Sequence, residues 1–287
     1  MSELKRYLKN IPLVPILYNT LVHLKTKFES ILFDLNLRIQ LSFIGEVNLN
    51  FEQESPTQEL VDKTSMYDKR VKNILPKILK LHRKYFSKFS RGFGEEIFHL
   101  MWLDVFWKFK PTKILEIGVY RAQTLSLFSL LAEKVSISDD FEVHGLSPFD
   151  NSGDAVSNYI SLDYLQDCKK NLRFFKCKNY FLHKELSTSP DAVRLIRDGN
   201  WDLVYIDGSH DYDIVTQDFA NAFIGLKENG IIVLDDSSLY FEHELNSNRF
   251  WGHPGPSRVA REIAGAKMKH LSLVGHNNVF QKVKMYD

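Results

Sequence analysis

The chain has 287 residues, of which 44% are apolar, so it is long enough for one large domain or for a domain with an appendage. Its 37 basic and 36 acidic side chains nearly cancel, which gives no reason to expect binding to nucleic acid. No run of 18 apolar residues predicts a transmembrane span, and Cys168 and Cys177 lack the spacing of metal ligands. We therefore expect a cytoplasmic protein whose two thiols are reduced.

Residues 1–92 are expected to form a mainly helical region that differs from the rest of the chain. Three basic residues precede an uncharged stretch at 11–24, as they do in a signal peptide. Two prolines interrupt that stretch and no small-residue cleavage site follows, so a signal peptide is disfavoured. Residues 1–40 could instead contact a membrane surface peripherally, or pack on the protein's own core or on a partner subunit of a homo-oligomer.

Apolar residues at helical spacing predict two long helices in this region. The first spans about 19–40, and a short strand or extended segment at 41–51 follows it. The second spans 58–86 and carries many basic residues on one side. These basic residues form either a solvated helix face or a docking surface for an acidic partner or membrane headgroups: Lys77, Lys80, Arg83, Lys84 and Lys88.

The segment 95–109 is so rich in apolar side chains that it should be a helix buried against a sheet, and Pro111 ends it. Strands and helices then alternate to the end of the chain. The expected strands are 114–117, 142–146, 180–182, 203–206 and 231–234, with helices at 122–134, up to about 175, 191–198, 212–227 and 257–265. A hairpin of 271–274 and 279–283 closes the chain. Residues 93–287 are therefore predicted to form an α/β domain, a Rossmann-like doubly wound sheet of seven strands with an antiparallel terminal hairpin.

The first strand of this domain ends in a turn that is suited to a ligand. Glu116 is the last polar residue of the strand and Gly118 follows two positions later, where the missing Cβ lets the backbone approach a bound molecule closely. A dinucleotide would require further glycines, but Tyr120 and Gln123 occupy those positions. The Glu116 carboxylate would repel a pyrophosphate, whereas it could pair with an ammonium group or hold a hydroxyl. A turn that binds no ligand is the alternative.

Three carboxylates follow two neighbouring strands. Asp207 ends one strand, and Asp235 and Asp236 end the next, one strand–helix–strand unit later. Parallel strands lie about 4.8 Å apart, so these acids can converge at one edge of the sheet. A cation would relieve their repulsion, and oxygen ligands favour Mg²⁺ or a similar divalent ion. The alternative is that the acids only orient loops and cap the next turn.

Three sequence stretches resemble a known family. They are Glu116-x-Gly118 after its strand, WDLVYIDGSH at 201–210 with GIIVLDD at 230–236, and VHGLSPFDNSGD at 143–154. Together they resemble class I S-adenosylmethionine-dependent methyltransferases, and among these the metal-dependent macrolide-sugar O-methyltransferases of the macrocin O-methyltransferase-like group. The resemblance covers about residues 93–287.

The resemblance implies S-adenosylmethionine as the cofactor and assigns roles to several residues. The expected cofactor-binding residues are Glu116, Gly118, Val119, Tyr120, Ser147, Phe149, Asp150, Ser187 and Asp207. Asp207, Asp235 and Asp236 would hold the metal, and His210 would act as general base together with Asp207.

The end of the second strand departs from the family pattern, which places an acid there to hold both ribose hydroxyls. This chain has Ser147, and Asp150 follows three residues later. Either Asp150 swings in, or the affinity for the cofactor is lower, or the ribose is held differently. Asp150 could also only form an Asx-turn, and Ser187 could serve as a helix N-cap.

The segment 237–256 is expected to cover the site, because its aromatic residues suit sugar faces and mobile lids are usual at such sites. We place Tyr240, His253 and Arg258 near the acceptor. Hydrophobic packing of a long loop is the alternative.

The predicted function is a divalent-metal-dependent O-methyltransferase that acts on a hydroxyl of a sugar or glycoconjugate. The metal would chelate two neighbouring hydroxyls and acidify one, while His210 removes the proton. Two alternatives stay open. One is a non-catalytic relative that binds the cofactor and acts through its N-terminal region, and the other is a small-molecule phenolic methyltransferase.

Overall fold

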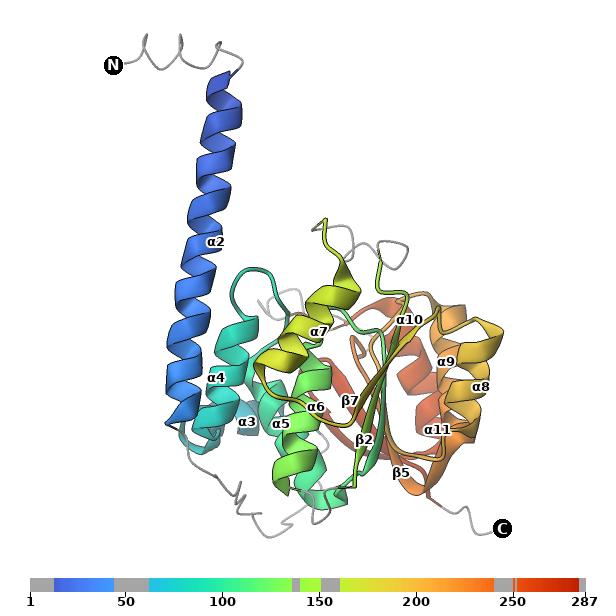
Figure 1. Cartoon of the computed structure of the whole chain (residues 1–287). Coiled ribbons are helices and arrows are strands. Elements are labelled where there is room, and N and C mark those ends of the chain that lie inside the picture. Colours follow the sequence, from blue (N-terminus) through green and yellow to red (C-terminus); the bar gives the residue numbers. More distant parts are fainter. Residues whose placement is uncertain are drawn as a thin grey trace.

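The computed structural model describes residues 13–43, 62–135, 140–150, 161–239, 250 and 252–283. A long helix and two shorter ones precede an α/β unit in which helices cover both faces of one sheet (Figure 1). The extended segment predicted at 41–51 lies almost wholly outside the described residues. Among the described helices, none is both long and apolar enough to cross a membrane.

The sheet has the predicted seven strands in the described part of the chain. They are β1 (Lys113–Ile117), β2 (Glu142–Ser147), β3 (Tyr180–Lys184), β4 (Trp201–Ile206), β5 (Leu226–Leu234), β6 (Lys269–Val274) and β7 (Asn277–Gln281). Their order is β3-β2-β1-β4-β5-β7-β6. The first five are parallel, whereas β7 runs antiparallel to both β5 and β6. The prediction of a Rossmann-like sheet with an antiparallel hairpin is confirmed. The order reverses between β1 and β4, which is where such sheets open a crevice for a ligand.

Successive strand residues point to opposite faces, and this alternation divides the core into two layers. On one face, Ile114 and Tyr205 pack with α5 (Glu96–Phe109) and α6 (Gln123–Val135). On the other face, Leu115 and Val204 pack with the helices that follow β3, β4 and β5. These helices are α8 (Pro190–Asp198), α9 (Tyr212–Gly225), α10 (Pro254–Val259) and the π-helical stretch Ala260–Ala264, which α11 (Gly265–Lys267) continues without buried residues, while α7 (Tyr164–Phe174) contributes to the first layer.

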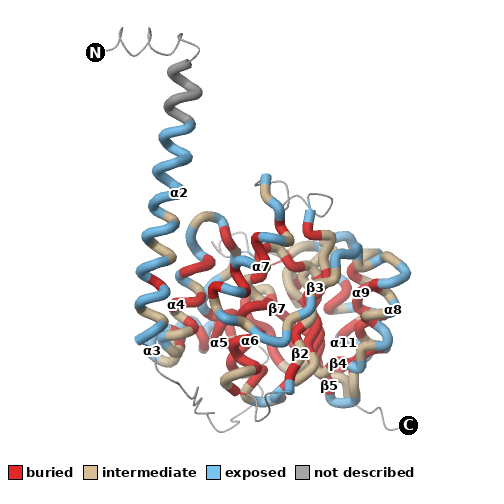
Figure 2. Tube along the Cα trace, viewed as in Figure 1, coloured by how far each residue is buried: buried red, intermediate tan, exposed pale blue. Residues whose placement is uncertain are grey.

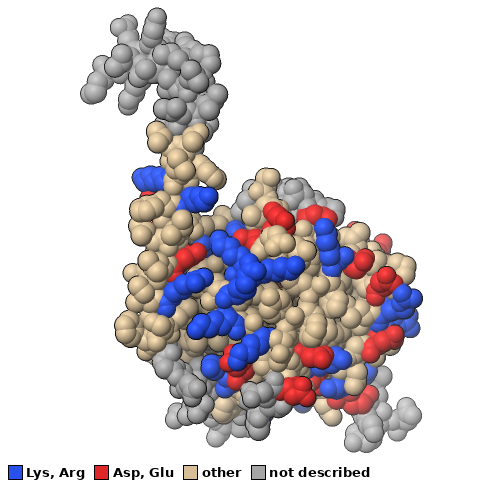
Figure 3. Space-filling view, in the orientation of Figure 1, with Lys and Arg blue, Asp and Glu red and all other residues tan. Residues whose placement is uncertain are grey.

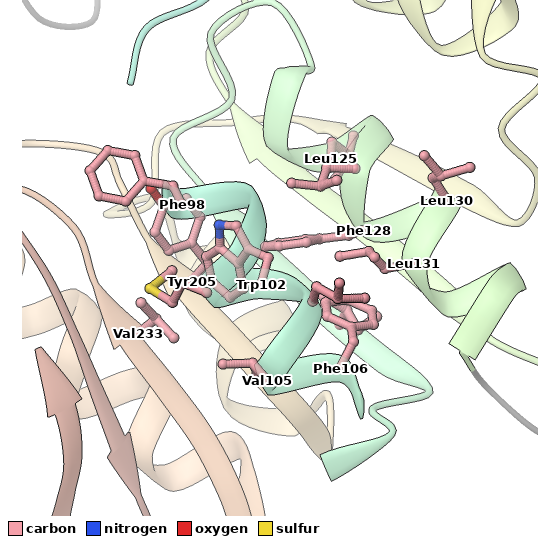
Figure 4. Packing of buried hydrophobic residues seen from close by; sticks show 14 of the residues in the cluster. Phe98, Trp102, Val105, Phe106, Leu125, Phe128, Leu130, Leu131, Tyr205 and Val233 are labelled. Atoms are coloured by element: carbon pink, nitrogen blue, oxygen red, sulfur yellow. The ribbon is translucent and has the colours of Figure 1, made fainter. Parts of the chain in front are cut away.

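Aromatic rings fill the centre of the first layer (Figure 4). Trp102 of α5 forms T-shaped pairs with Phe128 of α6, at 4.6 Å between centroids, and with Tyr205 of β4, at 5.0 Å. Phe128 is fully buried. The dense apolar segment at 95–109 is therefore the buried helix that its composition predicts.

The N-terminal region has three described helices, α2 (Leu13–Ser42), α3 (Thr64–Ile74) and α4 (Lys77–Phe86). The prediction of one helix over 58–86 is wrong, because Pro76 divides it. Proline has no N–H to donate and disfavours the helical conformation of the residue before it. Leu75 is accordingly extended, with φ −64° and ψ 119°.

The basic residues predicted on α4 do not form a surface of one sign. Lys80, Arg83 and Lys84 line a hollow of about 640 Å³ together with the acids Asp68 and Glu95. Figure 3 shows Lys and Arg gathered beside the base of α2, with acidic side chains among them. The charge around this hollow is therefore mixed.

The helix α2 touches the domain only through its C-terminal half, and the other half stands clear of it (Figures 1 and 2). The buried Arg91 guanidinium donates to Asp34 Oδ1 at 2.8 Å and to Ser30 Oγ at 2.8 Å. Leu37 is 1% exposed and packs with Tyr85 and Phe86. One ion pair and one small apolar cluster thus fix the direction of the helix.

The substitution Phe128→Ala should lower the free energy of unfolding by about 3–5 kcal/mol, because it leaves a cavity between Trp102 and Tyr205. Urea denaturation measures the effect. Ile224→Ala is the matched control, since Ile224 is 53% exposed and its loss should cost under about 0.5 kcal/mol. Equal shifts of the two midpoints would contradict this account of the core.

Candidate functional site

The turn after β1 packs directly on the end of β4. Gly118 has φ +100°, and a Cβ added there would lie 2.0 Å from the carbonyl oxygen of Asp207. The Gly118 N–H donates to the Leu146 carbonyl at 2.9 Å, and the Asp207 N–H donates to the Ile117 carbonyl at 2.8 Å. The ends of β1, β2 and β4 therefore meet around one glycine, at the point where the strand order reverses.

Glu116 lies beneath this turn and is 2% exposed. Its carboxylate accepts the backbone N–H of Leu125, in the first turn of α6. Burial, followed by the charge of Asp235, raises the pKa of Glu116 well above its usual range. Its Oε2 has no hydrogen-bond partner among the described residues. Glu116 thus supports the helix after the turn and keeps one buried oxygen available to a donor.

The three predicted acids meet at the edge of the sheet. Ile206 of β4 pairs in register with Leu234 of β5, so Asp207 and Asp235 follow as neighbours. The Asp235 N–H donates to the Ile206 carbonyl at 3.0 Å. The side chains of Asp207 and Asp235 therefore lie close enough for their charges to interact. Burial, followed by the charge of Asp235, raises the pKa of Asp207 well above its usual range.

Histidines compensate the third acid. His210 Nε2 lies 2.9 Å from Asp236 Oδ2, and His276 Nδ1 lies 3.1 Å from Asp236 Oδ1. Burial alone would raise the pKa of Asp236, but the hydrogen bonds from these two rings bring it below its usual range. His253 Nε2 lies 3.8 Å from Asp236 Oδ2. The structure therefore brings the predicted residues His210 and His253 to the predicted acids.

Sequence reasoning missed His276, which we had interpreted only as part of a hairpin. His276 Nδ1 also lies 3.1 Å from Asp235 Oδ1. Burial opposes protonation, but Asp235 and Asp236 raise the pKa of His276 to about 10. Its position follows from the insertion of β7 beside β5, where Asn278 Nδ2 donates to Ser237 Oγ at 2.8 Å. A histidine in a turn at the acid-bearing edge of the sheet was the signal that could have identified it.

Aromatic rings wall this cluster. His210 and His253 stack at 3.9 Å between centroids, with an interplanar angle of 20°. Phe250 lies 5.1 Å from His253 and 5.1 Å from His276, and Phe98 meets His276 at 4.8 Å. Phe98 is buried whereas Phe250 is 48% exposed, so these rings shield the cluster from water only on the side of Phe98.

Two glycines bring the segment after residue 250 against the cluster. Gly252 has φ +103°, and a Cβ there would lie 2.5 Å from the Asp236 carbonyl oxygen. A Cβ on Gly255 would lie 2.1 Å from the His210 carbonyl oxygen. The His253 N–H donates to the Asp236 carbonyl at 2.6 Å. The backbone of this segment thus sets the place of His253.

Arg258 and Tyr240 are the other residues that we predicted to lie near the acceptor. Arg258 is exposed on α10, where its Nε donates to Glu262 Oε2 at 2.8 Å and its guanidinium lies 4.1 Å above the Tyr212 ring. Its described contacts do not include the acid–histidine cluster. Tyr240 lies outside the described residues.

The predicted cofactor-binding residues near the turn divide between core and surface. Val119 is buried and packs toward Gly145 of β2, so only its backbone faces the turn. The Tyr120 ring is half-buried, 5.4 Å from Phe93 and 5.6 Å from Tyr164. These three rings form an aromatic rim beside Gly118.

The predicted residues farther along the edge also have defined surroundings. Ser147 ends β2, and its carbonyl accepts the Glu185 N–H at 3.1 Å. Phe149 is buried with φ 52°, and Asp150 is exposed. Ser187 Oγ lies 3.1 Å from Asp218 Oδ2 and donates to it. The hydroxyl of Ser187 is therefore engaged by the protein itself.

A segment of the N-terminal region, residues 88–95, crosses the turn, and we call it the strap. Arg121 Nη1 donates to the Phe89 and Ser90 carbonyls at 3.1 and 2.9 Å, while its other nitrogens hold Asp167 at 2.7 and 3.1 Å. Gln123 Nε2 donates to the Phe93 carbonyl at 2.8 Å. Arg83 donates to the Gly94 carbonyl. Residues directly after Gly118 thus fix the strap over the candidate cofactor site.

The donor set at the sheet edge is compatible with a metal ion. Asp207, His210, Asp235 and Asp236 border a cavity of about 10 Å³, close to the room that one water molecule or one small ion needs. Within the described part of the chain, two groups place their ligand atoms within 4.8 Å of one another: His210, Asp236 and His253, and Asp235, Asp236 and His276. Because the set mixes imidazole and carboxylate, it suits Mn²⁺ or Zn²⁺ as well as Mg²⁺.

Asp218 should make stability depend on pH. Burial raises the pKa of this carboxyl to about 6, so the native state holds its proton more tightly than the unfolded chain does. The stability that Asp218 contributes is present below about pH 4 and is lost as the pH rises through about 6. The free energy of unfolding of Asp218→Asn, relative to that of the parent, should therefore increase by up to about 3 kcal/mol from pH 4 to pH 8. Urea unfolding at the two pH values measures this difference.

Asp213→Asn is the matched control, because Asp213 is exposed on the same helix. If Asp218→Asn differed from the parent by the same free energy of unfolding at both pH values, the raised pKa of Asp218 would be contradicted.

Comparison with known proteins agrees with this geometry. Residues 115–237 match a family model that is described as a methyltransferase domain. Its fold is similar to that of an SAH-bound Podospora anserina methyltransferase, at 16% identity and TM-score 0.54, covering 82% of this chain and 100% of that one. A putative caffeoyl-CoA O-methyltransferase from Staphylococcus aureus is 13% identical with TM-score 0.53, covering 76% and 97%. A Bacillus cereus O-methyltransferase in complex with SAH is 14% identical with TM-score 0.51, covering 77% and 98%. No curated protein matches the chain.

Proposed function

We propose that this methyltransferase domain transfers a methyl group from S-adenosylmethionine to a hydroxyl oxygen of an acceptor. The observation that carries the proposal is the position of the acid–histidine cluster. Asp207, whose backbone packs on Gly118, is also the neighbour of Asp235 and Asp236. A ligand in the crevice at Gly118 therefore lies next to groups that can bind and deprotonate an oxygen nucleophile.

The cofactor would lie across the ends of β1, β2 and β4, with the strap above it. Gly118 provides the close backbone approach, and the buried oxygen of Glu116 can accept a donor from the amino-acid part of the cofactor. Ser147, Phe149 and Asp150 would border the ribose side, and Ser187 the adenine side. Because the Ser187 hydroxyl donates to Asp218, Ser187 would contact the cofactor through its backbone N–H or carbonyl.

His210 is the group that would take the proton of the acceptor. Asp236 holds the imidazole through Nε2 at 2.9 Å, and it would stabilise the ring once it is protonated. The stacked ring of His253 fixes the plane of His210. In-line transfer then requires only that the acceptor oxygen lie between the imidazole and the sulfonium methyl.

Asp207, Asp235 and Asp236 would hold a divalent metal, with His276 as a further donor from the hairpin. Such an ion would lower the pKa of an acceptor hydroxyl and fix its direction. The cluster can also be neutralised in another way, because His276 is held in the protonated form by the same two acids. The requirement for a metal is therefore a matter for experiment.

We favour a sugar or glycoconjugate hydroxyl as the acceptor, in a cytoplasmic enzyme. The resemblance to macrolide-sugar methyltransferases supports this class, and the rings of Phe98, Phe250 and His253 suit the apolar face of a sugar. The same rings would also accept a phenol. A non-catalytic protein that only binds the cofactor is the remaining alternative, and the experiments below distinguish all three.

Isothermal titration with S-adenosylmethionine should show binding, and a screen of sugar and phenolic acceptors with methyl-labelled cofactor should show acceptor-dependent transfer. His210→Gln should then reduce turnover by about 10²–10⁴-fold while cofactor affinity stays within about threefold. His23→Gln, on the exposed face of α2, is the control. A folded protein that binds no cofactor at millimolar concentration would remove the methyltransferase proposal, and binding without transfer to any acceptor would favour the non-catalytic alternative.

Mn²⁺ binding, followed by electron paramagnetic resonance, should show one tight site that Asp235→Asn weakens at least tenfold. Asp198→Asn, an exposed acid on α8, should bind as the parent does. If the metal takes part in catalysis, chelation should abolish transfer and Mg²⁺ or Mn²⁺ should restore it. Full activity in chelator, with no Mn²⁺ bound, would remove the metal from the mechanism.

A further inference from the structure

The helix α2 carries an apolar stripe that nothing in the described structure covers. Five large side chains on it are more than half exposed: Leu21 at 58%, Leu24 at 54%, Phe28 at 61%, Ile31 at 57% and Leu35 at 55%. Figure 2 shows the helix as mainly exposed along the part that stands clear of the domain. Exposed apolar surface of this extent marks an interaction site in a soluble protein.

The spacing within the stripe is regular. The intervals from Leu21 to Leu35 are three, four, three and four residues, which is the a and d pattern of a coiled-coil seam. Leu32 and Ile39, each 50% exposed, flank the seam and widen it. A helix that packed only on its own domain would not need a second apolar face with this period.

The stripe does not coincide with the face that docks on the domain. The docked face carries Ser30, Asp34 and Leu37, which contact Arg91 and the cluster around Tyr85. At 100° per residue, this face lies about 130° around the helix axis from the seam. The fold therefore holds α2 by one side and presents the other side outward.

We propose that α2 pairs along this seam with α2 of a second copy of the chain, so that the protein is a homodimer held by a short coiled coil. The area available is adequate. The exposed apolar side chains of two such helices would bury on the order of 1,500 Å² in total, the size of a standard specific interface. Because the N-terminal half of α2 stands clear of its own domain, a second helix can reach it without collision (Figure 1).

The charge on α2 argues for a protein partner over a lipid surface. A helix that lies on an anionic membrane carries many Lys and Arg on its polar face. The described part of α2 has three cationic and two anionic side chains, and Lys25 already pairs with Glu29 at 3.9 Å. Figure 3 shows this helix as a mainly uncharged column, which suits a self-complementary apolar seam.

The test is the mass of the full chain in solution, by light scattering after gel filtration from about 1 to 100 μM, a range that spans a dimer dissociation constant of about 10 μM. The parent should have twice the chain mass of 33.5 kDa at the upper concentrations. The double variant Leu24→Asp with Phe28→Asp should dissociate, with a dimer constant at least about 100-fold weaker, because it would bury four unpaired charges. Far-UV circular dichroism and thermal melting verify that the variant is folded.

Val22→Asp is the matched control. Val22 is 45% exposed on the same turn of the helix but lies off the seam, so its variant should stay dimeric. A monomeric parent at every concentration would overturn the proposal, and so would a dimer that survives the double seam variant. Co-sedimentation of the parent as a monomer with phosphatidylglycerol vesicles would overturn it in favour of a lipid surface.

Discussion

The contact between Gly118 and the end of β4 is the constraint on which the candidate site depends. The backbone at Asp207 approaches the turn so closely that any side chain at 118 would collide with it. This contact joins the cofactor crevice to the acid-bearing strands, because Asp207 belongs to both. A wider separation of β1 and β4 would leave a nucleotide crevice and an acidic edge with no common residue.

Charge compensation is the second requirement of that edge. Three carboxylates in a partly desolvated position would repel one another strongly. Burial and the charge of Asp235 raise the pKa of Asp207, which favours its neutral form, and imidazoles lie on both sides of Asp236. Because Asp235 and Asp236 raise the pKa of His276 to about 10, a metal that took His276 as a ligand would have to displace its proton. Metal affinity would then rise with pH, as expected for a ligand that is protonated when free.

Much of the fold could be predicted from the sequence, because its signals are local. Buried strands bounded by polar residues identify β1, β4 and β5, and parallel strands place Asp207 beside Asp235 whatever the details of packing. Pro76 was also a local signal, and the prediction of one long helix overlooked it. The fold class and the convergence of the acids at one edge of the sheet therefore belong to the part that a sequence can specify.

His276 and the strap could not be predicted in the same way. His276 reaches the acids only because β7 lies between β5 and β6, an order that the pattern of apolar residues does not determine. The strap is held through backbone carbonyls, and these have no residue-type signature. Arg121 and Gln123 look like ordinary surface residues until their acceptors, thirty residues earlier in the chain, are known.

The strap also limits how the chain can be truncated, and how its segments can be exchanged with those of similar proteins. A fragment beginning at residue 93 would lose Phe89 and Ser90, and with them two acceptors of the buried Arg121 guanidinium. It would also lose Arg91, through which α2 is anchored. A chimaera that joins the α/β unit to another N-terminal region would therefore need to carry residues 83–92 along with it. The helical region and the sheet would be inherited as one piece, even though the candidate site lies at the edge of the sheet.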